Sequence, residues 1–321
     1  MRTLCGVLCL LLVGCSESRP MAPPIGPTGP SPLPSTSNGW TLSGSVVATQ
    51  SAAPVRGATI APFGVSTNEA GAFTASGTGA RAPRLTIEAP GYLTRSTSLN
   101  TQTQEPRFDL ISLSGFSLDF YRAFVRNGFE APGTLQSLRR WTEAPRLYIR
   151  RVDEAGQTVD SSLVSLVERV ARDTPADWGP RFGFATIESG TETREGQAGW
   201  ITVKWLNPPE SGICGRAQVA VSGGWIHLNH LSDRCGGDGH RGIAPRAVRH
   251  EFGHAFGFWH TGNNNDLMSG GTWIDKNYNV TARERAYAAI AYTRPVGNTD
   301  PDNDPVGQAF SVTGSAYVVV D

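Results

Sequence analysis

The sequence of 321 residues lacks a cluster of positive charge and a second long apolar run, and each absence excludes a class of protein. Lysine plus arginine number 28, as do aspartate plus glutamate, and charged residues make up 17% of the chain. The positive charges form no cluster, so a nucleic-acid partner is not expected. Beyond the N-terminal segment no second long apolar run exists, so no membrane-spanning helix is expected there. Of five cysteines, only Cys214 and Cys235 lie beyond residue 15.

The first fifteen residues resemble a bacterial lipoprotein signal. Met1-Arg2 begins a charged segment, residues 4–13 are apolar but too short to span a bilayer, and Leu12-Val13-Gly14-Cys15 has the form of a lipobox. The resemblance implies cleavage before Cys15, which then carries several acyl chains and anchors the protein in a membrane. An ordinary secretion signal is the alternative. Either way the mature protein is expected to be exported, as a periplasmic or surface-facing lipoprotein in the first case.

Two segments without catalytic signals follow. Residues 16–38 are rich in Pro, Gly and Ser, which predicts an extended tether. Residues 39–113 contain short segments that alternate in polarity, which predicts a small β-sandwich. Motifs such as Ala89-Pro90-Gly91-Tyr92 resemble the carboxypeptidase regulatory-like (transthyretin-like) domain, which implies a spacer or binding module. The strands expected here are residues 41–48, 58–65, 72–76, 84–88 and 92–99.

The strongest chemical signal runs from His250 to His260 and has the pattern H-E-x-x-H-x-x-G-x-x-H. On a helix, residues i and i+4 share a face, so His250 and His254 can bind one metal ion together. Gly257 permits the sharp turn that returns His260 to the same ion. Three nitrogen ligands leave one position of a tetrahedral Zn²⁺ open, as in catalytic sites, and Glu251 is the candidate general base. A chance match and a metal site without catalysis are the alternatives.

This motif resembles that of the metzincin clan of zinc endopeptidases, in which a methionine-containing turn lies beneath the zinc. Residues 265–270 match that turn, so the resemblance implies that Met268 supports the histidines without binding zinc; an ordinary core methionine is the alternative. Gly270 stands where some families have a tyrosine, and Tyr278 is a weak substitute. The resemblance also implies a protein or peptide substrate, held along the free edge of a strand near residues 215–221.

The elements expected around the motif follow the metzincin order. Short segments rich in β-branched and aromatic residues predict strands. A helix is predicted over residues 160–173, because Leu163, Leu166, Val167 and Val170 repeat at helical spacing. Thr281 to Glu284 is a capping box that opens a further helix, which Pro295 stops. The fold class is therefore α+β, with a five-stranded mixed sheet, a zinc helix and a C-terminal helix. The strands expected are residues 146–151, 182–188, 200–205, 217–221 and 225–229. The domains expected after the sandwich are a helical connection over 114–143, a protease domain over 144–295 and a tail over 296–321.

Other residues that could bind metal carry weaker signals. His227 lies in a segment that resembles a structural-zinc strand of matrixins, but the partner positions do not match. A second cation site from His230, Asp233, Asp238 and His240 is weakly supported, and exposed loop histidines are the favoured alternative. Aspartates 300, 302 and 304 suggest calcium, but a solvated turn is the favoured interpretation.

Cys235 lies in the stretch Arg234 to Asp238, which resembles the matrixin cysteine switch. The switch precedes a catalytic domain, whereas Cys235 lies inside the predicted one, so a disulfide with Cys214 is favoured. An exported protein permits such a bond.

Two functions follow from the sequence. The first is an exported, membrane-anchored zinc endopeptidase. The alternative is a surface-binding lipoprotein whose sandwich binds the partner and whose zinc site is structural or vestigial. Glu251 beside an open coordination position favours the first.

Overall fold

A computed structural model describes residues 39–99, 105–236, 242–270, 279–307 and 318–320. The predicted lipid-anchor residue Cys15 and the tether lie outside the described residues. Residues 39–321 form one compact unit. None of the described helices is long and apolar enough to cross a membrane.

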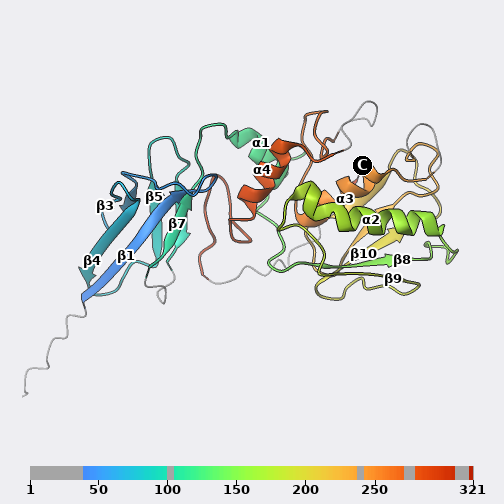
Figure 1. Cartoon of the computed structure of the whole chain (residues 1–321), viewed down its shortest axis with the longest axis horizontal. Helices are drawn as coiled ribbons and strands as arrows, with labels where there is room; N and C mark the ends of the chain where they lie inside the picture. Colours follow the sequence, from blue (N-terminus) through green and yellow to red (C-terminus); the bar gives the residue numbers. More distant parts are fainter. Residues whose placement is uncertain (1–38, 100–104, 237–241, 271–278, 308–317, 321) are drawn as a thin grey trace, which may run out of the picture. The chain divides into compact units, whose positions relative to one another are not determined.

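Two small sheets enclose a hydrophobic core in the N-terminal part of this unit (Figure 1). The first sheet has the order β4-β1-β7 and the second β3-β2-β5-β6. The strands are β1 (Gly39–Ala48), β2 (Thr59–Ala61), β3 (Val65–Ser66), β4 (Ala72–Thr78), β5 (Arg84–Glu88), β6 (Arg95–Ser98) and β7 (Arg107–Leu110). Leu42, Ile60 and Ile87 alternate with more exposed neighbours and are fully buried, as expected for half-buried strands. The expected strand over residues 58–65 is interrupted, because Pro62 follows β2 and Gly64 turns with φ +67°.

The larger sheet is mixed and has the order β13-β11-β12-β10-β8-β9. Its strands are β8 (Arg146–Arg150), β9 (Thr186–Gly190), β10 (Trp200–Trp205), β11 (Gly215–Gln218), β12 (Gly224–Leu228) and β13 (Val318–Val320). The strands from β12 to β9 are parallel, whereas β11 is antiparallel to both of its neighbours. The predicted count of five strands is wrong, because β13 adds a sixth at the edge next to β11.

Helices α2 (Ser161–Trp178) and α3 (Pro245–Phe256) lie on one face of this sheet (Figure 1). Asp160 caps α2 by accepting the N–H of Ser162. The helix runs five residues beyond the predicted end and continues through Pro175, which has no N–H to bond the carbonyl oxygen four residues earlier. The extra turn places Trp178 in the core, stacked on Phe258 at 5.0 Å.

Segment 114–143, to which the sequence assigned only a connecting role, contributes to this same core. Its helix α1 (Leu118–Arg126) is capped by Ser117 and contacts α4 (Ala282–Ala291) through an edge-on pair of Phe120 and Tyr287. Phe124 stacks on Phe258 with ring centroids 4.5 Å apart. Its carbonyl oxygen accepts the backbone N–H of Trp259 at 2.7 Å. The connection is thus packed against the loop that follows α3.

The aspartates of the tail are not a solvated turn. Asp302 and Asp304 are buried, at 1% and 6% exposure. Arg294 bonds both carboxylate oxygens of Asp302 at 2.8 Å, and Arg95 bonds Asp304 at 2.8 Å. Burial would lower the pKa of Arg294, but Asp302 and Asp109 outweigh it and raise that pKa. These carboxylates therefore pair with arginine, and neither calcium nor solvation accounts for them.

Candidate metal centre

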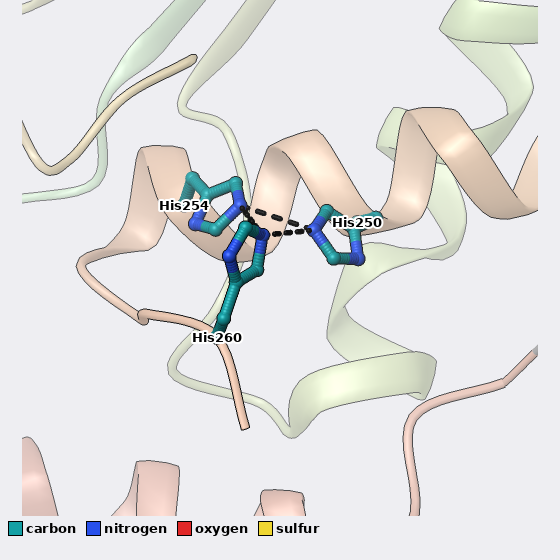
Figure 2. Close-up of side chains that lie close together, drawn as sticks. All are labelled: His250, His254 and His260. Carbon is teal, nitrogen blue, oxygen red and sulfur yellow. Dashed lines mark hydrogen bonds between the residues drawn. The ribbon is translucent and has the colours of Figure 1, made fainter. Parts of the chain in front are cut away.

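Three histidines converge at the C-terminal half of α3 and the loop after it (Figure 2). His250 and His254 stand one turn apart on the helix, and His260 returns from the loop. Their Nε2 atoms lie 3.0 Å apart for His250 and His254, and 3.2 Å from the Nε2 of His260 in both other pairs. All three side chains are buried, at 0%, 0% and 5% exposure. The sequence motif therefore forms one cluster.

The other ring nitrogen of each histidine faces an acceptor. The Nδ1 atom of His250 lies 2.7 Å from the carbonyl oxygen of Leu267, and that of His254 lies 2.7 Å from the carbonyl oxygen of Phe258. His260 Nδ1 bonds the carboxylate of Glu130. Since a carbonyl oxygen only accepts, Nδ1 carries the hydrogen in these pairs and the Nε2 lone pairs face one another.

Three lone pairs directed at one point repel one another unless a cation lies between them. Zn–N bonds of about 2.0–2.1 Å at tetrahedral angles place ligand nitrogens roughly 3.3 Å apart, close to the spacing here. Within the described ranges, these histidines are the one group of three or more His, Cys, Asp or Glu residues placed to hold a metal ion. The donor set fits zinc, and the three residues could hold it.

The return of His260 depends on Gly257, as the sequence predicted. Gly257 ends α3 with φ +111°, and its N–H bonds the carbonyl oxygens of Gly253 and His254. A Cβ at this position would also overlap with the carbonyl oxygen of Arg139. Both the backbone angle and the close approach of segment 114–143 therefore require glycine.

Met268 is fully buried and its side chain lies against α3. A Cβ on Gly253 would overlap with the Sδ atom of Met268, so this glycine of the motif lets the methionine pass directly under α3. The backbone N–H of Met268 donates to Glu284 Oε1 at 2.8 Å. Glu284 also closes the capping box of α4 with Thr281. Burial raises the pKa of Glu284, against the lowering effect of the N–H groups of Met268 and Thr281.

Glu251 follows the first histidine and is fully buried. A Cβ on Gly215 would overlap with its carboxylate, so the backbone of β11 lies directly against this group. The neighbouring residue Cys214 forms a disulfide with Cys235, as predicted, across a separation of 21 residues. A bridge of that span contributes about 3 kcal/mol in the chain-entropy estimate. It also ties the start of β11 to the loop that precedes α3.

The free edge expected for the strand near residues 215–221 is not free. β13 pairs antiparallel with the outer side of β11, with Arg216 opposite Val320, Ala217 opposite Val319 and Gln218 opposite Val318. The sequence predicts a final strand within residues 309–320, the stretch that contains β13, but indicates no neighbour for it. Pairing between segments about a hundred residues apart leaves no local pattern from which to predict it.

The other histidines do not form a second cation site among the described residues. Arg216 contacts Nδ1 of His227 through Nε at 3.2 Å and through Nη2 at 3.1 Å. Burial, then Lys204 and Arg216, lower the pKa of His227 to about 3. His230 is buried and packs edge-on against Trp205 at 5.6 Å, so the expectation of exposed loop histidines is wrong for both residues. Asp238, His240 and Tyr278 lie outside the described residues.

Glu130 is the part of the centre that the sequence analysis missed. It lies 130 residues before His260, in a segment without a metal-binding pattern, and a lone glutamate in such a segment carries no signal of its role. Phe258 and Trp259 are fully buried core residues. At Gly270, a Cβ would approach the ring of His260 to 3.0 Å, so the backbone here passes close to the third histidine.

Comparisons with known proteins leave the family open. No protein-family model and no curated protein matches the chain. A solved structure of metalloproteinase-II from Bacteroides fragilis aligns with 10% identity and a TM-score of 0.31, over 77% of this chain and 84% of that one. A structure described as a chaperone-substrate complex aligns with 16% identity and a TM-score of 0.28, over 49% of this chain. The chain spans about a third of that protein's length, with 34% covered. Alignments at these scores do not establish a shared fold.

Proposed function

We propose that this chain is a zinc-dependent endopeptidase of metzincin type. The observation that carries the proposal is the convergence of three buried Nε2 atoms. The buried carboxylate of Glu251, which follows the first of these histidines in the sequence, supports it. His250, His254 and His260 would hold the ion, and Met268 would support them from below. Three ligands leave a coordination position open, which distinguishes a catalytic site from a closed structural one.

The proposed reaction is hydrolysis of a peptide bond. When bound, zinc supplies a Lewis acid that lowers the pKa of water and polarises a carbonyl group. Glu251 accepts a proton from the attacking water and then returns it to the leaving amine nitrogen. The backbone of β11 at Gly215 lies directly against this carboxylate. The acceptors behind the three imidazoles keep their rings oriented during this proton transfer.

The proposed substrate is an extended segment of protein or peptide. A chain laid along β11, in the place that β13 takes in this structure, would pair with it through backbone hydrogen bonds. It would pass close to Glu251, since Gly215 contacts that carboxylate. Backbone pairing selects extended conformation more than side-chain identity. The substrate class is therefore broad.

We further propose that the protein works outside the cytoplasm, anchored to a membrane through lipidated Cys15. The lipobox-like sequence at residues 12–15 supports the anchor. The disulfide of Cys214 and Cys235 supports an oxidising compartment. Metabolic labelling with a palmitate analogue, compared between the wild type and Cys15→Ser, tests the anchor.

The decisive experiment compares the wild type, Glu251→Gln and Glu192→Gln for bound zinc and for cleavage of a peptide library. Glu192 is a matched control because its side chain is 70% exposed. Glu251→Gln should keep zinc while cleavage falls about 10²- to 10⁴-fold, the range for loss of a general base. The control should behave as wild type. Equal cleavage by Glu251→Gln and wild type would rule out the proposed role. If the wild type and a chain that lacks residues 318–321 both bind zinc and neither cleaves any peptide, the binding lipoprotein is favoured.

A further inference from the structure

We infer that Glu130 is a positioning residue for the third metal ligand, which makes segment 114–143 part of the metal centre. Glu130 is the charged partner among the three acceptors behind the histidines, because His250 and His254 face main-chain carbonyl oxygens. A carboxylate behind an imidazole fixes the ring and increases its basicity as a ligand. His260 is also the one proposed ligand that lies outside α3.

The segment around Glu130 is held against both sides of His260. Before the histidine, the N–H of Trp259 donates to the carbonyl oxygen of Phe124 at 2.7 Å. After it, a Cβ on Gly262 would lie 3.0 Å from the ring of Phe129. Between these two contacts, Asn127 ends α1 with φ +58° and turns the chain toward the metal centre. Glu130 therefore reaches His260 from a fixed backbone.

The test measures zinc affinity in the full-length protein by competition with a chelator. Glu130→Ala should weaken zinc binding about 10- to 100-fold, the range for loss of an outer partner of a ligand. Glu130→Gln should fall between Glu130→Ala and wild type, since an amide oxygen still accepts the Nδ1–H bond without its charge. Asp119→Asn is the matched control, because Asp119 lies in the same segment with its side chain 95% exposed.

The thermal stability of the zinc-free variants separates positioning from folding. If the role of Glu130 is confined to the metal centre, zinc-free Glu130→Gln should have the same melting temperature as zinc-free wild type, while its zinc affinity is reduced. Wild-type affinity in both Glu130 variants would overturn the inference. An equal loss in Asp119→Asn would overturn it as well. Because the measurement is of zinc binding, it is independent of whether the protein cleaves peptides.

The pairing of β11 carries a second inference, which rests on the proposed function. The geometry points to β13 as a self-inhibitory strand that covers the substrate edge. β13 occupies the side of β11 opposite β12, so both sides of β11 are paired. An added substrate strand would need that same side. The pairing spans three residue pairs, which is short for a strand and suits reversible displacement.

This second inference is tested by comparing the cleavage kinetics of the full-length protein with those of a chain that lacks residues 318–321. The shortened chain should show a several-fold lower KM at unchanged kcat, because the tail competes with substrate and takes no part in the chemistry. A free peptide with the sequence of residues 316–321 should restore the higher KM, while a scrambled peptide should not. If the wild type cleaves peptides and the shortened chain has the same KM, the inference about β13 is wrong while the proposed function stands. If neither chain cleaves any peptide, the proposed function fails.

Discussion

Two histidine environments in this chain differ in what faces the second ring nitrogen. At the candidate metal centre, the carbonyl oxygen of Leu267 accepts the hydrogen on Nδ1 of His250, which leaves the Nε2 lone pair for a metal. At His227, the guanidinium of Arg216 instead donates a hydrogen bond to Nδ1, and Lys204 adds further positive charge. Burial is similar, at 0% and 6% exposure. The group that faces Nδ1 therefore sets which ring nitrogen carries the hydrogen, and so whether an Nε2 lone pair is left for a metal.

The largest expected effect comes from His254→Gln, compared with His227→Gln. Removing one of three converging ligands should reduce zinc affinity by more than the 10- to 100-fold expected for an outer partner, and cleavage should be lost with the metal. His227→Gln should retain the zinc content and activity of wild type. Metal analysis of the purified variants checks both. Loss of zinc from His227→Gln would show that the two environments are coupled.

A smaller effect is expected at Gly253, where α3 lies against Met268. In Gly253→Ala, the new Cβ should push against Met268, at about 1–3 kcal/mol for overpacking. The higher helix propensity of alanine offsets about 1 kcal/mol of that. We expect a net loss of stability in urea denaturation, with weaker zinc binding as Met268 and the histidines shift. A variant that is more stable than wild type, with wild-type zinc affinity, would contradict the close contact.

Local sequence patterns predicted the parts of this centre that depend on local geometry. The i, i+4 spacing of His250 and His254 and the glycine at 257 follow from helix periodicity and from positive φ, which act over a few residues. The capping box at Thr281 is also a local signal, and the structure shows both of its hydrogen bonds. Glu284 of this box also accepts the N–H of Met268. That bond was not predicted, because the tertiary fold brings together residues 16 positions apart.

Contacts between distant segments account for what the sequence could not predict. Glu130 and His260 are 130 residues apart, and β13 and β11 about 100, so no periodicity links either pair. The buried pairs of Asp302 and Asp304 were misinterpreted for a related reason. Aspartates among Pro and Asn indicate a solvated turn. Their burial is stabilised by Arg294, by the amide of Asn298 and by the distant Arg95.

Acid stability sharpens the comparison at His227. Its pKa is about 3 in the folded protein, below the ordinary 6.5, so the unfolded chain binds the proton first as the pH falls. His227 therefore lowers the free energy of unfolding progressively as the pH falls from 6.5 to 3, by at most about 1.4 kcal/mol per pH unit. His227→Gln should have a flatter stability profile across that window, measured by urea denaturation at several pH values. Parallel profiles for the two proteins would show that His227 is not held neutral.

The smallest effect, and the sharpest test of the comparison, is expected from Arg216→Gln. Removing this guanidinium should raise the pKa of His227 by only part of its displacement, because burial is the largest cause and Lys204 remains. An NMR titration of the His227 ring measures the change. Zinc content should stay at one ion per chain, since no second and third ligand converge on His227 among the described residues. A second bound zinc in Arg216→Gln would mean that positive charge alone had kept metal away from His227. One ion would show that a ligand site needs converging partners as well as a free lone pair.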